Sequence, residues 1–227
     1  MSAVQPRQEV IYPESDGKPM ADNTKQFRWI LTIYTGIASL FKDDPNVFVA
    51  GDLLWYPVEG DNKTRTAPDV MVVFGRPKGD RLSYKQWEED GVAPQVVFEV
   101  LSPGNRLSEL IEKFLFYQRF GVEEYYVYDP DTGRLDGWIR GEDGTLQPIE
   151  QMEGWVSPRL GIRFSVQSGE LVLTRPDGLP FVTPEELEAR WTQAEQRAIA
   201  AEYRAQEAEA RAERLAAKLR DLGIEPE

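Results

Sequence analysis

Neither cysteine nor histidine occurs among the 227 residues of the chain. The absence of cysteine excludes disulfides, thiolate nucleophiles and sulfur-based zinc sites. The absence of histidine removes the Ser-His type of nucleophilic catalysis, the most common general base and most transition-metal sites. Any chemistry must therefore come from carboxylates, lysine or tyrosine, together with a hard cation such as Mg²⁺.

Long apolar runs and positive charge are also scarce. No stretch of about 18 apolar residues is present, and the first residues lack the basic and apolar segments of a signal peptide. We therefore expect a cytoplasmic protein without membrane contact. The formal net charge of −13 argues against a nonspecific nucleic-acid coat, because affinity for phosphates comes mainly from Lys and Arg.

The apolar pattern predicts an α/β core with a β extension over residues 21–183, after an N-terminal arm at 1–20. The expected elements are a helix at 24–41 with Asp22 or Asn23 as N-cap, strands at 47–57, 67–75 and 94–101, a turn at 102–105, a helix from 107 that Gly121 ends, a strand at 123–133, and short hairpins at 134–173. The face of the first helix expected in the core comprises Phe27, Ile30, Leu31, Tyr34, Ile37, Ala38 and Phe41.

Residues 184–222 have a different pattern, which predicts a coiled coil. From Leu187 to Leu222 the seam residues, mostly alanine, alternate steps of four and three over about five heptads. The flanking g positions hold Arg190, Arg197, Arg204, Arg211 and Lys218, and the e positions hold Glu188, Glu195, Glu202 and Glu209. A parallel pair sets Arg against Glu, whereas an antiparallel pair sets Arg against Arg. We therefore expect a parallel homodimer over 187–222, with a single solvated helix, or one folded back on its own domain, as the alternative.

Two lone carboxylates interrupt apolar strand segments. Asp69 follows Pro68 and precedes four apolar residues, and Glu99 lies within the run VVFEV. A buried unpaired charge costs several kcal/mol, and two close anions repel each other. A Mg²⁺ or Mn²⁺ ion between them would remove the repulsion, with the backbone carbonyl of Val100 as a further ligand. Asp52, on the neighbouring strand, is an additional candidate ligand.

A positive charge near these carboxylates is expected from Lys113. Glu99 precedes the end of its strand, and Lys113 lies in the following helix, each roughly 10 Å from the intervening turn at the usual rise per residue. Tyr117, one helical turn later, and Ser102, at the turn, are expected beside them. Each residue alone also has a structural interpretation: Asp69 as a strand-entry residue, Glu99 in a structural ion pair, and Lys113 as a solvated helix lysine.

Four motifs occur together: Pro-Asp at 68–69, Glu-Val-Leu-Ser-Pro at 99–103, Lys-x-x-x-Tyr at 113–117 and GVEEYYVYDP at 121–130. Over roughly residues 20–170 they resemble the Uma-two family, a bacterial group within the PD-(D/E)xK, or restriction-endonuclease-like, superfamily. The resemblance implies a core of a helix, a mixed β-sheet, a helix and a further strand. It also implies that Asp69 and Glu99 bind Mg²⁺ and that Lys113 is the catalytic lysine. The superfamily pattern places lysine two residues after the glutamate, where this chain has Leu101, so the helix would have to supply it.

These features leave more than one function open. The first is an Mg²⁺- or Mn²⁺-dependent endonuclease that hydrolyses phosphodiester bonds in DNA. Its substrate would need a local basic rim, which we expect from Arg65, Lys78, Arg81, Lys85 and Arg106. The second is a catalytically inactive binding or regulatory module on a nuclease fold, dimerised through its coiled coil. In a third, the tail binds a partner helix and is the main functional part.

Overall fold

The computed structural model describes residues 10–17 and 19–221, which form two compact units divided between Thr183 and Pro184. The elements of the first unit, in chain order, are α1 (Thr24–Leu40), β1 (Val47–Gly51), β2 (Trp55–Tyr56), β3 (Val70–Phe74), β4 (Tyr84–Lys85), the 3-10 helix η1 (Gln86–Glu89), β5 (Val96–Val100), α2 (Leu107–Phe120), β6 (Glu124–Asp129), β7 (Arg134–Arg140), β8 (Leu146–Pro148), β9 (Arg163–Gln167) and β10 (Glu170–Thr174). The second unit contains α3 (Pro184–Asp221).

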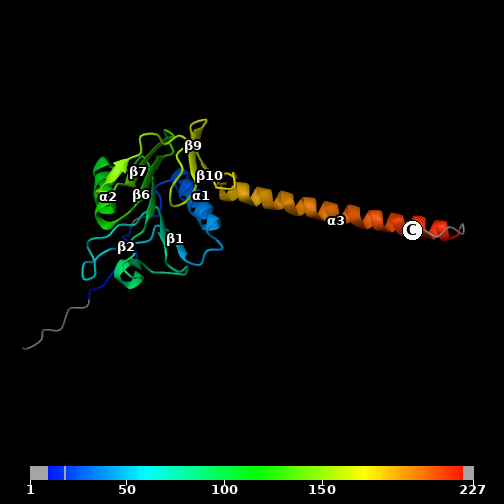
Figure 1. Ribbon diagram of the computed structural model, residues 1–227, viewed down its shortest axis with the longest axis horizontal. Helices are drawn as coiled ribbons and strands as arrows, with labels where there is room; N and C mark the ends of the chain where they lie inside the picture. The colour runs from blue at the N-terminus through cyan, green and yellow to red at the C-terminus, as the bar shows by residue number, and fades with distance from the viewer. Residues whose placement is uncertain (1–9, 18, 222–227) are drawn as a thin grey trace, which may run out of the picture. The chain divides into compact units, whose positions relative to one another are not determined.

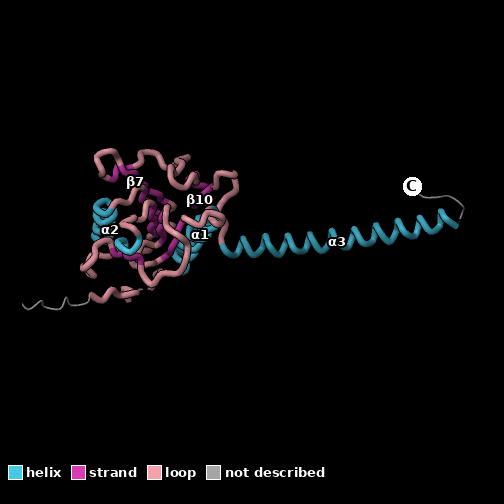
Figure 2. Tube along the Cα trace, turned by 60° about the horizontal axis from the view of Figure 1, so that its bottom comes forward, coloured by secondary structure: helices cyan, strands magenta, loops and turns pink. Residues whose placement is uncertain are grey.

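Six strands form one mixed sheet in the order β1-β3-β5-β6-β7-β8. β5 and β6 are parallel and are connected through α2, whereas the other neighbouring strands are antiparallel. Figures 1 and 2 show the sheet between α1 and α2. β9 and β10 form a separate antiparallel hairpin. The α/β class and the order of helix, sheet, helix and further strand agree with the sequence prediction.

Alternation along the strands decides which side chains meet which helix, because successive residues of a strand point to opposite faces. Val96, Phe98 and Val100 of β5 belong to the core on the α1 side. Val97 belongs to the core on the α2 side, so Glu99, two residues later, also faces α2. Burial on both faces explains why β5 reads as an almost continuous apolar run.

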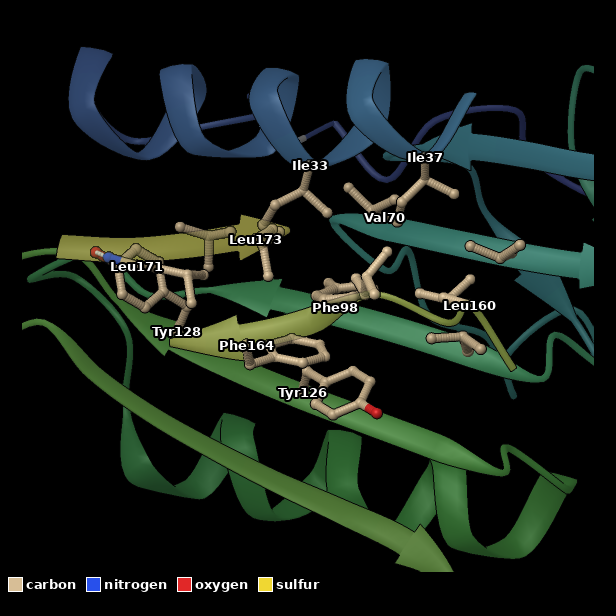
Figure 3. Close-up of a cluster of buried hydrophobic side chains, with 14 of the residues drawn as sticks. Ile33, Ile37, Val70, Phe98, Tyr126, Tyr128, Leu160, Phe164, Leu171 and Leu173 are labelled. Atoms are coloured by element: carbon tan, nitrogen blue, oxygen red, sulfur yellow. Dashed lines mark hydrogen bonds between the residues drawn. The ribbon is translucent and has the colours of Figure 1, made fainter. Parts of the chain in front are cut away.

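The core on the α1 side is closed by the β9–β10 hairpin. Figure 3 shows Ile33 and Ile37 of α1 above the sheet, with Phe164 of β9 near Phe98 and Tyr126. The rings of Phe164 and Tyr126 lie 4.5 Å apart between centroids. Each such buried side chain contributes roughly 1.5–3 kcal/mol, so the hairpin is an integral part of this core.

Two local predictions were wrong. Phe27, expected in the core, is 42% exposed, because the buried face of α1 is centred on Ile30, Ile33 and Ile37 and Phe27 lies at its edge. The expected strand at 47–57 is broken at Asp52, whose φ of 48° lies in the left-handed region. The break ends β1 and lets β2 pair with β4 instead.

α3 is one continuous helix of 38 residues. Its apolar side chains at the seam include Leu187, Trp191 and Leu215, which are 43%, 73% and 53% exposed. Leu222, the last residue of the predicted heptad seam, lies outside the described residues. Among the helices that the structure describes, none combines the length and the apolar character needed to cross a bilayer.

Candidate active site

Asp69 and Glu99 lie on the same face of the sheet, toward α2. Val70 of β3 pairs with Phe98 of β5 in an antiparallel register, and continuing this register sets Asp69 opposite Glu99. Side chains directly across an antiparallel pair approach within about 5 Å at Cβ. The two carboxylates that the sequence singled out are therefore neighbours.

Glu99 is 4% exposed and receives two donors from α2. The Lys113 ammonium lies 2.6 Å from Oε2, and the Tyr117 hydroxyl donates to Oε1 at 2.5 Å. Lys113 and Tyr117 are four residues apart, so they occupy one face of α2, one turn from each other. Lys113 also donates to the carbonyl oxygen of Ala67 at 3.3 Å. These contacts explain why a buried carboxylate is tolerated in β5, because one cation and one hydroxyl stabilise its charge.

Asp69 is less well compensated. Its Oδ2 accepts a hydrogen bond from the backbone N–H of Val100 at 2.7 Å, and its Oδ1 forms no hydrogen bond with the described residues. Burial, and then the neighbouring Glu99, raise the pKa of Asp69 to about 8, although Lys113 acts in the opposite direction. A carboxyl group with so high a pKa is poised to bind a proton or a cation at neutral pH.

The Lys113 ammonium and the Tyr117 hydroxyl both keep their protons. Burial alone would lower the pKa of Lys113, but the Glu99 and Asp69 carboxylates together raise it above its ordinary value. Burial and the Glu99 carboxylate raise the pKa of Tyr117 well above its ordinary value. The cluster thus has a permanent cation and a permanent hydroxyl donor at neutral pH.

The other residues expected at the site occupy its surroundings. Asp52 lies on the cleft wall, and burial, followed by the charge of Asp16, raises its pKa. The carbonyl oxygen of Val100, expected as a metal ligand, accepts a hydrogen bond from the buried Gln26 side chain at 2.7 Å. Ser102 has no hydrogen bond to Glu99 among the described residues, and its hydroxyl donates to Asp22 at 2.5 Å, which ties the end of β5 to the segment before α1.

The expected basic rim does not gather at one place, and this corrects the sequence prediction. Of the five residues, Arg65 alone lines the cleft of the described structure. Lys78 donates to backbone carbonyls just after α1, while Arg81 and Lys85 pair with carboxylates of η1. Arg106 is the N-cap residue of α2. These residues were assigned to the rim because their loops are next to the motif strands in sequence, and sequence proximity alone does not reveal local ion pairs.

The cluster opens into a cleft of about 750 Å³. Its walls include residues 16, 19 and 20 of the N-terminal arm with residues 21 and 22 that follow it, the loop 63–67, the turn 104–105 and one side of α2. Sequence reasoning missed Lys63 on the loop and Gln26 of α1. Lys63 had no pattern to distinguish it. Gln26 shares a helix face with Ile30, Ile33 and Ile37, and a polar residue on that apolar face is a signal that could have found it.

The donor set fits a hard divalent cation only in part. Mg²⁺ usually takes one or two carboxylates and keeps several waters, which Asp69 and Glu99 can satisfy. Within residues 10–17 and 19–221, however, no cluster of three or more carboxylates has the arrangement of a metal site. An ion bound to Glu99 would also compete with Lys113 for Oε2. Of the two carboxylates, Asp69 is therefore the better candidate ligand, because its Oδ1 accepts no hydrogen bond from the described residues and its pKa is raised.

Fold and site together define a mixed α/β domain with a buried acid–lysine cluster at the bottom of a cleft. The chain belongs to the Uma2 family, described as "Putative restriction endonuclease", whose profile matches residues 8–176. Family membership supports a nuclease-like function. The match ends before α3.

One similar solved structure is "a putative nuclease belonging to DUF820" from Anabaena variabilis ATCC 29413. It is 18% identical to this chain, with a TM-score of 0.45, over 62% of this chain and 74% of the other. No curated protein matches the chain.

Proposed function

We propose that the chain is a cytoplasmic endonuclease that hydrolyses phosphodiester bonds in DNA with Mg²⁺ or Mn²⁺. The observation that carries the proposal is the incompletely compensated Asp69 beside the Glu99–Lys113 ion pair, at the bottom of a cleft. Such an arrangement costs folding free energy, and carboxylates with strongly raised pKa values in clefts are typical of functional sites.

Each residue of the cluster has a role in this proposal. Asp69 and Glu99 would hold the ion, whose chemistry is Lewis-acid polarisation of the phosphate. The Lys113 ammonium would stabilise negative charge that develops on the phosphate oxygens. The Tyr117 hydroxyl fixes the orientation of the Glu99 carboxylate, and the Val100 N–H fixes that of Asp69.

A second candidate function is a catalytically inactive module that binds a partner through the same cleft. Two observations favour it. Both oxygens of Glu99 are already engaged by Lys113 and Tyr117, and Leu101 stands where the superfamily pattern has its lysine. A fold does not by itself specify an activity.

Calorimetric titration with Mn²⁺ tests the first candidate. We expect binding by the wild-type chain and a loss of at least about tenfold in affinity for Glu99→Gln, because the amide keeps the shape and removes the charge. Glu142→Gln, an exposed substitution in the turn between β7 and β8, is the matched control and should bind normally. DNA cleavage should be lost in Asp69→Asn and Lys113→Met. Mn²⁺ binding without cleavage by the wild type would favour the second candidate.

We also propose that α3 pairs with α3 of a second copy in a parallel coiled coil. Leu187, Trp191 and Leu215 of the seam are exposed in the single chain, and Trp191 is 73% exposed. In a parallel pair Arg190 faces Glu195, and Arg197 faces Glu202, whereas an antiparallel pair brings like charges together. Because the charges of α3 complement those of a parallel copy, we propose a second copy of the chain as its partner.

Light scattering measures the mass directly. We expect twice the chain mass of 25.9 kDa for the wild type. Ala205→Glu places a charge in the seam and should give monomers, whereas Gln196→Glu adds the same charge on the outer face and should leave the dimer intact. A monomeric wild type at high micromolar concentration would refute the pairing.

A further inference from the structure

We infer that the cleft takes an unpaired nucleic-acid strand and excludes an intact duplex. This inference rests on the nuclease function proposed above and specifies its substrate. Three properties of the cleft carry it: walls around the acid–lysine cluster, a negative charge balance, and apolar side chains close to the site.

The lining of the cleft comes from several segments that are far apart in sequence. These segments include the N-terminal arm, the 63–67 loop, the 104–105 turn and α2. A volume of about 750 Å³ is that of a small-ligand site and corresponds to roughly one or two nucleotides. A single strand needs less room between these segments than a duplex does, which is the first reason for the inference.

The arm is tied down at both ends of the segment that lines the cleft. Near its start, the Tyr12 hydroxyl accepts a hydrogen bond from the Gly60 N–H at 2.6 Å, and the Tyr12 ring packs on Tyr56 with centroids 5.2 Å apart. Near its end, Asp22 accepts the Ser102 hydroxyl hydrogen bond. The wall is therefore fixed at two points that are not adjacent in sequence, which limits how far it can withdraw for a wide substrate.

Charge on the walls also disfavours a duplex. Besides Asp69 and Glu99, the described lining includes five carboxylates: Asp16, Asp22, Asp52, Glu109 and Glu112. The described lining has three cations, Lys63, Arg65 and Lys113. Duplex binding depends on basic residues that neutralise phosphates along both strands. Lys63 and Arg65 lie on one loop. Two cations there can neutralise one or two phosphates of a single strand.

Apolar lining offers contacts that only unpaired bases can use. Met20, Leu54, Leu110 and Phe116 line the cleft, and Met20 is 43% exposed. Bases that are not stacked in a duplex gain affinity by contact with apolar and aromatic side chains. Because the cleft has little positive charge, its affinity for a single strand would come from these apolar contacts and from the two loop cations.

The test compares a labelled single-stranded DNA oligonucleotide with the blunt duplex and the RNA of the same sequence, using the full chain. Binding is measured by fluorescence anisotropy with Ca²⁺, and cleavage with Mn²⁺. We expect the single strand to bind at least about tenfold more tightly than the duplex and to be cut faster. Lys63→Ala should weaken single-strand binding and lower its salt dependence, while Lys42→Ala, an exposed substitution after α1, should not.

The outcomes separate the inference from the proposed function. Equal binding and cleavage of duplex and single strand would overturn the inference and leave the nuclease proposal standing. Cleavage of the RNA strand alone would support the inference that the cleft takes an unpaired strand, and it would identify the substrate as RNA and not DNA. No cleavage of any of the three with Mg²⁺ or Mn²⁺ would overturn the nuclease proposal and the inference with it.

Discussion

Asp69→Asn should make the folded chain more stable at neutral pH. The amide oxygen of asparagine can still accept the Val100 N–H, so the contact at 2.7 Å is retained. What disappears is the buried carboxyl group, whose pKa is raised to about 8 by burial and by Glu99. Residues that serve a function commonly destabilise the fold, and their replacement then stabilises it.

The magnitude follows from the pKa of Asp69. Between its ordinary value of 3.8 and about 8, the folded state keeps a proton that the unfolded chain releases, so the free energy of unfolding falls as pH rises. At about 1.4 kcal/mol per pH unit, the loss reaches at most about 4 kcal/mol at pH 7. Asparagine also loses the electrostatic attraction to Lys113, and this loss offsets part of the gain in stability. We expect Asp69→Asn to be about 1–3 kcal/mol more stable at pH 7.

Urea unfolding followed by tryptophan fluorescence, at pH 5 and at pH 8, measures the effect. The stability difference between Asp69→Asn and the wild type should grow from the lower pH to the higher. Asp43→Asn, an exposed substitution in the turn after α1, should show no such growth. If Asp69→Asn is instead less stable than the wild type at both pH values, Asp69 has a structural role and its carboxyl group does not destabilise the fold.

Three further predictions concern the partners of buried carboxylates, each measured by urea unfolding. Tyr117→Phe removes a donor from Glu99 and should cost about 1–3 kcal/mol; an unchanged midpoint would mean that water replaces the hydroxyl. Lys113→Met leaves Glu99 unpaired and should cost about 3 kcal/mol, much of it recovered by adding Glu99→Gln; no recovery would refute the pairing argument. Ser157→Ala removes a donor from Glu124 and should cost about 1–3 kcal/mol without changing Mn²⁺ binding.

The centre of the candidate site could be predicted because strand and helix geometry are regular. The period of two places Glu99 opposite the α1 face, and the rise per residue brings Lys113 level with it, so their meeting follows from sequence positions alone. These are short-range consequences of repeating structure. The register of β3 and β5, with Val70 opposite Phe98, is different: both strands are apolar on both faces, so their pattern does not specify it.

The surroundings of the site could not be predicted, because they depend on contacts between segments far apart in sequence. Gln26 reaches Val100 across 74 positions, and Ser102 reaches Asp22 across 80. The break of the strand at Asp52 depends on a positive φ at a residue other than glycine, which local propensity disfavours. The basic loop residues were placed wrongly for a different reason: local ion pairs such as Arg81–Glu89 depend on how the loop itself folds.

Asp69 and Glu124 differ in their hydrogen-bond donors, and this difference says more about function than burial does. Glu124 is 1% exposed, and burial raises its pKa as well. Its oxygens nevertheless accept hydrogen bonds from the hydroxyls of Tyr126 and Ser157 and from the Arg159 N–H, which fasten the segment before β9 to β6. Asp69 has one backbone donor and a second carboxylate beside it. Glu124 is thus explained by the fold alone, whereas Asp69 has one donor among the described residues and a like charge beside it. This difference is why we propose Asp69, and not Glu124, as the cation ligand.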